Sequence, residues 1–225
     1  MLKNYYIFFI ILPAILIRNL FYVKYRENFE ENKKIVLLGD SIFKNNNYVN
    51  HDESVEFLLK KELTDSKKLY TVAQDNATID NVYNQLNNVP RNIDGESTYI
   101  FISVGGNDLL ENYIYSNDPE NNPENINIME SIFNKYNDLI DKIINTFSKS
   151  NVVLSTIYYP LSHSYKPYYP IINNWNTKIS ELAREKNIKI IRIDKDMKKK
   201  SDFVDTVEPS SNGSIIIVNN IMAHI

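Results

Sequence analysis

Residues 35–41 read IVLLGDS, an uninterrupted apolar run that leads into a glycine, an aspartate and a serine. An apolar run of this length, ended by a turn residue, is typical of a strand that is buried on both faces of a parallel sheet. The chain has only five glycines, and a chain that uses so few is expected to keep them where the backbone needs them. We therefore predict a buried strand over 35–38, a sharp turn at Gly39, and Ser41 at the carboxyl end of the strand.

Strand and helix patterns alternate along the rest of the chain. Further strands are predicted at 69–73, 99–104, 152–158 and 188–193, and helices at 54–63, 77–89, 129–147, 171–186 and 212–224. This alternation indicates a three-layer α/β/α sandwich with a five-stranded parallel sheet, a flavodoxin-like architecture of strand order 2-1-3-4-5. The stretches 109–128 and 194–205 are predicted to be irregular.

Composition limits the classes of function. With 225 residues and 43 % hydrophobic residues, the chain has enough apolar material for one sizeable domain. A net charge of -3 offers no basic excess for a phosphate backbone, so we expect no nucleic-acid partner. The absence of cysteine excludes disulfides, thiolate metal sites and a cysteine nucleophile. No metal or cofactor is implied, and the sequence does not indicate an oligomeric state.

The N-terminus carries an apolar run over residues 5–17, preceded by Lys3 and followed by Arg18. As a helix this run would span about 20 Å, which is short for a bilayer core but suits a signal segment. No small-x-small cleavage site follows, so we favour an uncleaved signal anchor over 1–26 that attaches the protein to a membrane. A cleaved signal peptide, giving a secreted or lumenal protein, and a helix packed on the domain are the alternatives. Residues 27–34 are predicted to be a linker, and 35–225 the folded domain.

Three polar blocks are predicted to meet at one edge of the sheet. Gly39-Asp40-Ser41 follows the first strand, Gln74-Asp75-Asn76 the second, and Gly105-Gly106-Asn107-Asp108 the third. A further polar stretch, residues 205–213, DTVEPSSNG, precedes the last helix. The carboxyl ends of parallel strands lie together, and ligands bind there in open α/β sheets. We interpret Asp40 and Asp108 as turn and scaffold residues.

The blocks that begin at Gly39 and Gly105, followed by residues 205–213, resemble in this order those of the SGNH/GDSL hydrolases, a family of serine esterases and lipases, over about residues 33–224. The resemblance implies that Ser41 is the nucleophile. It also implies an oxyanion hole made by the Ser41 backbone N–H, the Asn107 side-chain amide and a third donor. The family places that third donor at a glycine N–H after the second strand, where this chain has Asn76. Asparagine tolerates left-handed backbone geometry better than most residues, so we expect the Asn76 N–H to replace it.

The chain departs from the family pattern at the catalytic base. Glu208 stands where the family has histidine, and Asp205 stands at the position of the family's acid. A carboxylate is a weaker base than imidazole, but two carboxylates in one site raise the pKa of one of them. We therefore predict a catalytic set of Ser41, Glu208 and Asp205. The alternative is a degenerate hydrolase that keeps the fold and uses its pocket for binding.

The substrate is predicted only by class. Candidate lining residues are Gly106, Tyr159 and His163, the last two in an aromatic-rich loop over 158–170. Such a loop could stack on sugar rings or line an acyl pocket, or it could be a rigid loop packed by its own tyrosines. If the loop stacks on sugar rings or lines an acyl pocket, the substrate is a small-molecule, lipid or acylated-carbohydrate ester.

Overall fold

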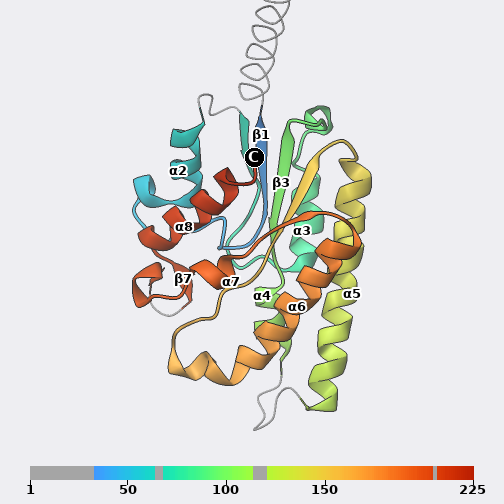
Figure 1. Cartoon of the computed structure of the whole chain (residues 1–225), viewed down its shortest axis with the longest axis vertical. Helices are drawn as coiled ribbons and strands as arrows, with labels where there is room; N and C mark the ends of the chain where they lie inside the picture. Colours follow the sequence, from blue (N-terminus) through green and yellow to red (C-terminus); the bar gives the residue numbers. More distant parts are fainter. Residues whose placement is uncertain (1–32, 64–67, 114–120, 205–206) are drawn as a thin grey trace, which may run out of the picture. The chain divides into compact units, whose positions relative to one another are not determined.

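A five-stranded parallel sheet forms the centre of the fold in the computed structural model, which describes residues 33–63, 68–113, 121–204 and 207–225. The strand order is β2-β1-β3-β4-β5, and each neighbouring pair is parallel (Figure 1). The strands are β1 (Lys34–Gly39), β2 (Leu69–Thr71), β3 (Thr98–Ser103), β4 (Asn151–Ser155) and β5 (Lys189–Ile191). The predicted fold class and strand order are confirmed.

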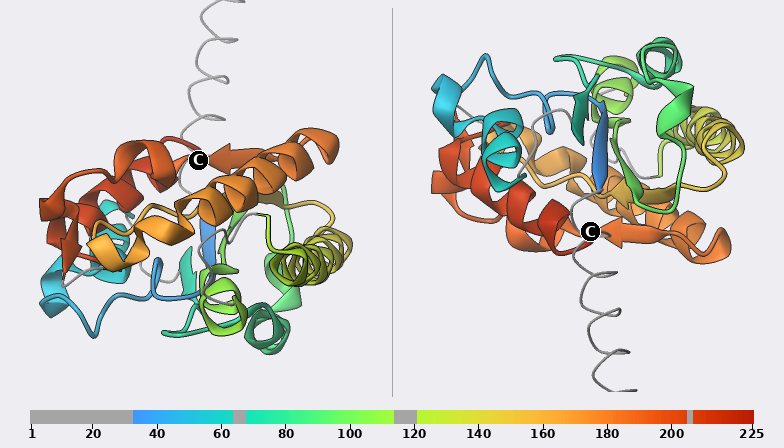
Figure 2. Two further views of the ribbon diagram at one scale, coloured as in Figure 1. Left: turned by 90° about the horizontal axis from the view of Figure 1, so that it is seen from below. Right: turned by 90° about the horizontal axis from the view of Figure 1, so that it is seen from above.

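Helices cover both faces of the sheet, because alternate side chains of each strand point to opposite faces. Val36 and Leu38 pack in a cluster with side chains of α3 (Ile79–Leu86), α5 (Pro123–Thr146) and α6 (Tyr169–Glu185). Ile35 and Leu37 pack on the other face with α2 (Val55–Glu62), α7 (Ile193–Asp196) and α8 (Ser211–Met222). Figure 2 shows the cyan α2 and red α8 across the sheet from the yellow α5. The three layers leave the carboxyl edge of the sheet to the loops.

The segment 109–128 is more regular than predicted. Helix α4 covers Gly106–Asn112, and α5 begins at Pro123 rather than near residue 129. Asn122 caps α5 by accepting hydrogen bonds from the backbone N–H groups of Glu124 at 2.9 Å and Asn125 at 3.5 Å. Asparagine followed by proline thus marks the start of a helix here. Proline is tolerated in the first turn because the backbone N–H that it lacks would have no partner within the helix. The same residue types also occur in loops, which is why the sequence pattern predicts an irregular segment here.

The segment 194–205 is also not a plain loop. It contains α7, a 3-10 turn over Lys200–Asp202 and strand β6 (Phe203–Val204). Strand β6 pairs antiparallel with β7 (Glu208–Pro209), with Val204 opposite Glu208. This small hairpin carries Glu208 and had no periodic signal in the sequence, because two-residue strands are too short to show one.

Two sequence predictions fall outside the described residues. The expected anchor and linker lie almost wholly within residues 1–32, and Asp205 lies in the pair 205–206. The compact unit that is described begins at Lys34 and ends at Ile225. No helix within the described ranges has both the length and the apolar character of a membrane span.

Candidate active site

The turn after β1 is built around Gly39. Its φ angle is +126°, and a Cβ atom at this position would lie 1.7 Å from the carbonyl oxygen of Ser103 on the neighbouring strand. The buried side chain of Gln85 accepts from the Gly39 N–H and donates to the Gly39 carbonyl oxygen, both at 2.8 Å. Only glycine fits this close approach. The turn therefore presents Asp40 and Ser41 in a fixed orientation at the end of the strand.

Asp40 supports the turn. Its Oδ1 accepts hydrogen bonds from the Ile42 N–H at 3.1 Å and from the Ser103 hydroxyl at 3.4 Å. Burial raises the pKa of Asp40 from 3.8 to about 8, with a further contribution from the nearby charge of Glu208. The carboxyl group is therefore mostly protonated at neutral pH. A neutral, hydrogen-bonded carboxyl group fits the scaffold role predicted from the sequence.

Two backbone N–H groups in the loops that follow β1 and β2 are candidates for an oxyanion hole. Among the described residues, neither the Ser41 N–H nor the Asn76 N–H has a hydrogen-bond partner. Asn76 has a φ angle of +57°, in the left-handed region. Asn76 thus has the left-handed backbone that is expected where asparagine replaces a glycine. Asparagine adopts this conformation at a small cost in free energy.

Asn107 lies at the start of α4, two positions after a second strained glycine. Gly105 has a φ angle of +110°, and a Cβ there would meet the ring of Trp175 at 2.2 Å. The Asn107 side-chain Nδ2 donates one hydrogen bond to the Ala77 carbonyl oxygen at 3.0 Å. An amide nitrogen carries two hydrogens, so one N–H remains for a further acceptor. The bond to Ala77 also places Asn107 beside the loop that holds Asn76.

Asp108 holds the same loop from the other side. Both of its carboxylate oxygens accept from the Ile79 N–H at the start of α3, at 3.3 and 3.1 Å. Burial raises the pKa of Asp108 to about 6. Its partners are backbone groups of a helix terminus, which is the role of a cap. Asp108 is a scaffold residue, as the sequence indicated.

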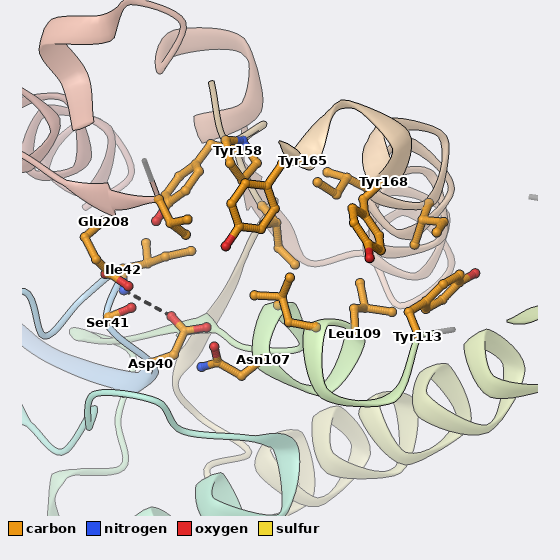
Figure 3. A pocket seen from close by; sticks show the side chains of 17 residues that line it. Asp40, Ser41, Ile42, Asn107, Leu109, Tyr113, Tyr158, Tyr165, Tyr168 and Glu208 are labelled. Atoms are coloured by element: carbon orange, nitrogen blue, oxygen red, sulfur yellow. Dashed lines mark hydrogen bonds between the residues drawn. The ribbon is translucent and has the colours of Figure 1, made fainter. Parts of the chain in front are cut away.

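Glu208 projects from the hairpin toward Ser41 (Figure 3). The Glu208 carboxylate lies beside the Ser41 side chain (Figure 3), and the interaction with Ser41 favours its ionised form. Burial raises the pKa of Glu208, the interaction with Ser41 lowers it, and the charge of Asp75 raises it again, with a net increase. The second carboxylate oxygen, Oε2, is buried and has no hydrogen-bond partner within the described part of the chain. The base candidate is thus placed against the nucleophile candidate.

Three further residues lie near this pair. Asp75 follows β2 and accepts hydrogen bonds from the Tyr48 hydroxyl, at 2.9 Å to each carboxylate oxygen. Burial and the hydrogen bond to Asp75 raise the pKa of Tyr48, and the charges of Glu208 and Asp75 raise it further, so the three groups lie close together. Asn45, fully buried, connects the Ser41 turn to the hairpin. The placement of Asp75 directly after a strand was the available clue; Tyr48 and Asn45 lie in a polar stretch without a pattern.

The histidines lie elsewhere. All three belong to described segments, and none lines the pocket that contains Ser41. His51 packs edge-on against Phe57, and the His224 Nδ1 lies 2.7 Å from the Asn220 carbonyl oxygen. His163 lies on the 3-10 turn His163–Tyr168, next to a different surface hollow. His163 is therefore not a neighbour of the Ser41 side chain in this structure.

The pocket at Ser41 has a volume of about 680 Å³, its open mouth included. Gly106 lines it as predicted, but Tyr159 does not. The Tyr159 hydroxyl instead donates to Asn173 at 3.3 Å, and its ring packs against Tyr169. Its neighbour Tyr158 lines the pocket in its place. The complete lining is Asp40, Ser41, Ile42, Gly106, Asn107, Leu109, Leu110, Tyr113, Ile157, Tyr158, Pro160, Tyr165, Tyr168, Ile171, Ile172, Val207 and Glu208.

Comparison with known proteins gives a family and a fold. Residues 35–221 match the family described as GDSL-like Lipase/Acylhydrolase. Among solved structures, an acetyl xylan esterase matches with a TM-score of 0.64 and 16 % identity over 85 % of this chain and 99 % of that one. An esterase from Pseudoalteromonas sp. matches with a TM-score of 0.60 and 18 % identity over 85 % of this chain and 95 % of its own. No curated protein sequence matches the chain.

A phospholipase A1 from Streptomyces albidoflavus NA297 has a TM-score of 0.61 and 14 % identity, over 86 % of this chain and 99 % of its own. At identities this low the structural likeness establishes the fold alone.

Proposed function

Because the chain belongs to the GDSL-like lipase/acylhydrolase family, we propose that it is a serine ester hydrolase that works through an acyl-enzyme on Ser41. The observation that carries the proposal is the position of the Glu208 carboxylate beside the Ser41 side chain at the wall of a pocket (Figure 3). A serine hydroxyl is a weak nucleophile until an adjacent base accepts its proton. Glu208 is the base in this position.

In the first half of the reaction, the Ser41 Oγ attacks the ester carbonyl carbon while Glu208 takes the hydroxyl proton. The carbonyl oxygen becomes an oxyanion, and the N–H groups of Ser41 and Asn76 and the free N–H of the Asn107 amide donate to it. A single donor of this kind contributes about 3–4 kcal/mol to transition-state stability. When the tetrahedral intermediate collapses, the bond to the alcohol oxygen breaks and Glu208 returns the proton to the departing alcohol.

In the second half, water attacks the carbonyl carbon of the acyl-enzyme and Glu208 takes a proton from it. Collapse releases the carboxylic acid, and Ser41 regains its proton. Burial and the charge of Asp75 raise the pKa of Glu208, which brings this carboxylate closer to the proton affinity needed near neutrality. Asp205, the acid expected from the sequence, is assigned the supporting role by family resemblance only.

A binding module is the second candidate, favoured by one observation. No histidine of the described segments lines the pocket, and a carboxylate is a weaker base than an imidazole. A protein of this kind would keep the pocket and the unpaired backbone donors and bind an ester or a carboxylic acid without turnover.

The two functions are separated by hydrolysis of p-nitrophenyl butyrate from pH 4 to 9 with the wild type, Ser41→Ala and Glu208→Gln. We expect loss of activity in Ser41→Ala and a decrease of about 10²–10⁴-fold in Glu208→Gln, the usual contribution of a general base. A fluorophosphonate ester, which traps activated serines, should form a bond from phosphorus to the Ser41 Oγ with loss of fluoride, so that the mass of the phosphonyl group is added in the wild type only. A wild type that neither hydrolyses the ester faster than Ser41→Ala nor reacts with the phosphonate is a binding module.

A further inference from the structure

The pocket at Ser41 has a polar end and an apolar end. Figure 3 shows Asp40, Ser41 and Glu208 together at one end, with Leu109 and Tyr113 at the other. Apart from Gly106 and Asn107, the rest of the wall is aliphatic or aromatic. We call this part the apolar arm; it is lined by Leu109, Leu110, Tyr113, Ile157, Pro160, Tyr165, Tyr168, Ile171 and Ile172.

Charge in the pocket is restricted to the polar end. Among the described residues that line it, Asp40 and Glu208 are the two carboxylic acids, and no lysine, arginine or histidine contributes. A buried anion needs a cationic or hydrogen-bonding partner, so a phosphate or carboxylate group on the substrate would be unfavourable here. A sugar would need several aimed polar groups along the arm, whereas aliphatic side chains make up most of it. The lining fits a neutral alkyl chain.

The direction of the arm assigns this alkyl chain to one side of the ester. The base that deprotonates the nucleophile later protonates the leaving alcohol, so the alcohol must lie on the Glu208 side of Ser41. The apolar arm extends away from Glu208, past Asn107 and along α4 (Figure 3). The group that remains on Ser41 after the alcohol leaves is the acyl group, and this group faces the arm.

We propose, as a consequence that rests on the proposed serine hydrolase function, that the apolar arm selects the acyl chain and that the substrates are neutral esters of unbranched acids several carbons long rather than acetyl esters. Leu110 is 48 % exposed and lines the arm near its open side, so the end of a longer chain has an exit to solvent. Each methylene that becomes fully buried should raise kcat/KM by about fourfold.

The test uses two matched series of esters. In the first, p-nitrophenol is the constant alcohol and the acyl group is acetyl, butyryl or hexanoyl. In the second, acetyl is the constant acyl group and the alcohol is ethanol, butanol or hexanol, with acid release followed by titration. We expect kcat/KM to rise at least tenfold from acetyl to hexanoyl in the first series, and less than threefold across the second. Ser41→Ala supplies the background rate.

Two leucine-sized residues on helices provide a matched pair of variants. Leu110 lines the arm, whereas Ile215 on α8 is 49 % exposed and does not line it. Leu110→Ser should lower the ratio of the hexanoyl to the acetyl rate constant at least threefold, and Ile215→Ser should leave it unchanged within twofold. Because both side chains are half exposed, neither substitution removes core packing.

The outcomes distinguish the two proposals. Ser41-dependent hydrolysis with a flat acyl series, or with a steeper alcohol series, overturns the assignment of the arm and leaves the hydrolase function intact. Absence of Ser41-dependent hydrolysis for every ester overturns the hydrolase function. In that case calorimetric titration of the wild type with methyl hexanoate and methyl acetate tests whether the apolar arm binds the acyl chain. Tighter binding of the hexanoate, weakened by Leu110→Ser, supports it, and equal or no binding overturns it.

Discussion

The Asn45 side-chain amide donates a hydrogen bond to the Pro209 carbonyl oxygen at 3.2 Å, across a sequence separation of 164 residues. The same amide nitrogen donates to the Ser214 hydroxyl at 2.6 Å, and Asn45 Oδ1 accepts from the Val55 N–H at 3.0 Å. Asn45 lies four positions after Ser41, and Pro209 directly follows Glu208. One fully buried side chain therefore connects the segment of the nucleophile candidate to the hairpin of the base candidate.

Replacement of this residue, Asn45→Ala, should affect both stability and turnover. It leaves the buried partners without a hydrogen bond, which costs about 1–3 kcal/mol each, so the free energy of unfolding in urea should fall by at least that amount. The hairpin also loses its tie to the Ser41 turn, and kcat should decrease at least tenfold with a smaller change in KM. Asn50→Ala, which removes a solvent-exposed bond to Glu53, is the control and should change neither quantity. If Asn45→Ala had the free energy of unfolding and the kcat of the wild type, Asn45 would not position the hairpin against the Ser41 turn.

Glu208→His should raise hydrolysis of a small activated ester at pH 7. An imidazole has a pKa near 6.5, which matches this pH better than an unperturbed carboxylate near 4.3. The donors of the oxyanion hole are unchanged by the substitution. Steady-state rates of the wild type, Glu208→His and the double variant with Ser41→Ala measure the effect. A rate below that of the wild type would mean that Glu208 is a working base in a site adapted to carboxylate.

Asp75→Asn should shift the acidic limb of the pH–rate profile to lower pH. The negative charge of Asp75 contributes to the raised pKa of Glu208, so its removal lowers that pKa. Glu208 must be deprotonated to act as a base, and activity on the acidic limb should then appear at lower pH. The logarithm of kcat/KM plotted against pH from 4 to 8 gives the midpoint. A midpoint that does not move, or that moves to higher pH, would refute the electrostatic coupling.

The free energy of unfolding should decrease less with rising pH in Asp40→Asn than in the wild type. Asp40 has a pKa of about 8 in the folded protein, raised from 3.8. Between these two values the folded chain holds a proton that the unfolded chain has released. This contribution is fully present below about pH 4 and is lost as the pH rises toward 8.

Asparagine keeps a neutral oxygen acceptor for the Ile42 N–H and does not ionise. Relative to the wild type, Asp40→Asn should therefore gain at least about 1.4 kcal/mol of unfolding free energy between pH 5 and 8.5, the equivalent of one pKa unit. Urea unfolding at the two pH values provides the measurement. An equal change in both proteins would show that Asp40 does not titrate in this range.

Residues 1–26 are proposed to attach the chain to a membrane. The apolar run over 5–17 lies beside Lys3 and Arg18 and lacks a cleavage site, the arrangement of a signal anchor. Deletion of 1–26 should move the protein from the membrane pellet to the supernatant after carbonate washing. Full-length protein that is already found in the supernatant at its full mass would refute the anchor.

The sequence was sufficient for the architecture and for the nucleophile side of the site. The apolar run 35–38 and the alternation of patterns predicted the parallel sheet and its strand order, because burial on two faces requires a continuous apolar strand. Scarce glycines marked Gly39 and Gly105, whose positive φ angles and close contacts exclude a side chain. The left-handed backbone of Asn76 was predictable for the same reason, since asparagine is among the few residues that adopt it readily.

The tertiary structure alone decided which side chains surround Ser41. Tyr158 lines the pocket and its neighbour Tyr159 does not, because consecutive side chains outside a helix point in different directions and only packing selects the one that faces inward. Asn45 and Asp75 reach the site through contacts between segments far apart in the chain. Such contacts leave no periodic trace in a single sequence, since they depend on the packing of whole elements. The strands and turns are local properties of the chain, whereas the composition of the pocket is a property of the assembled fold.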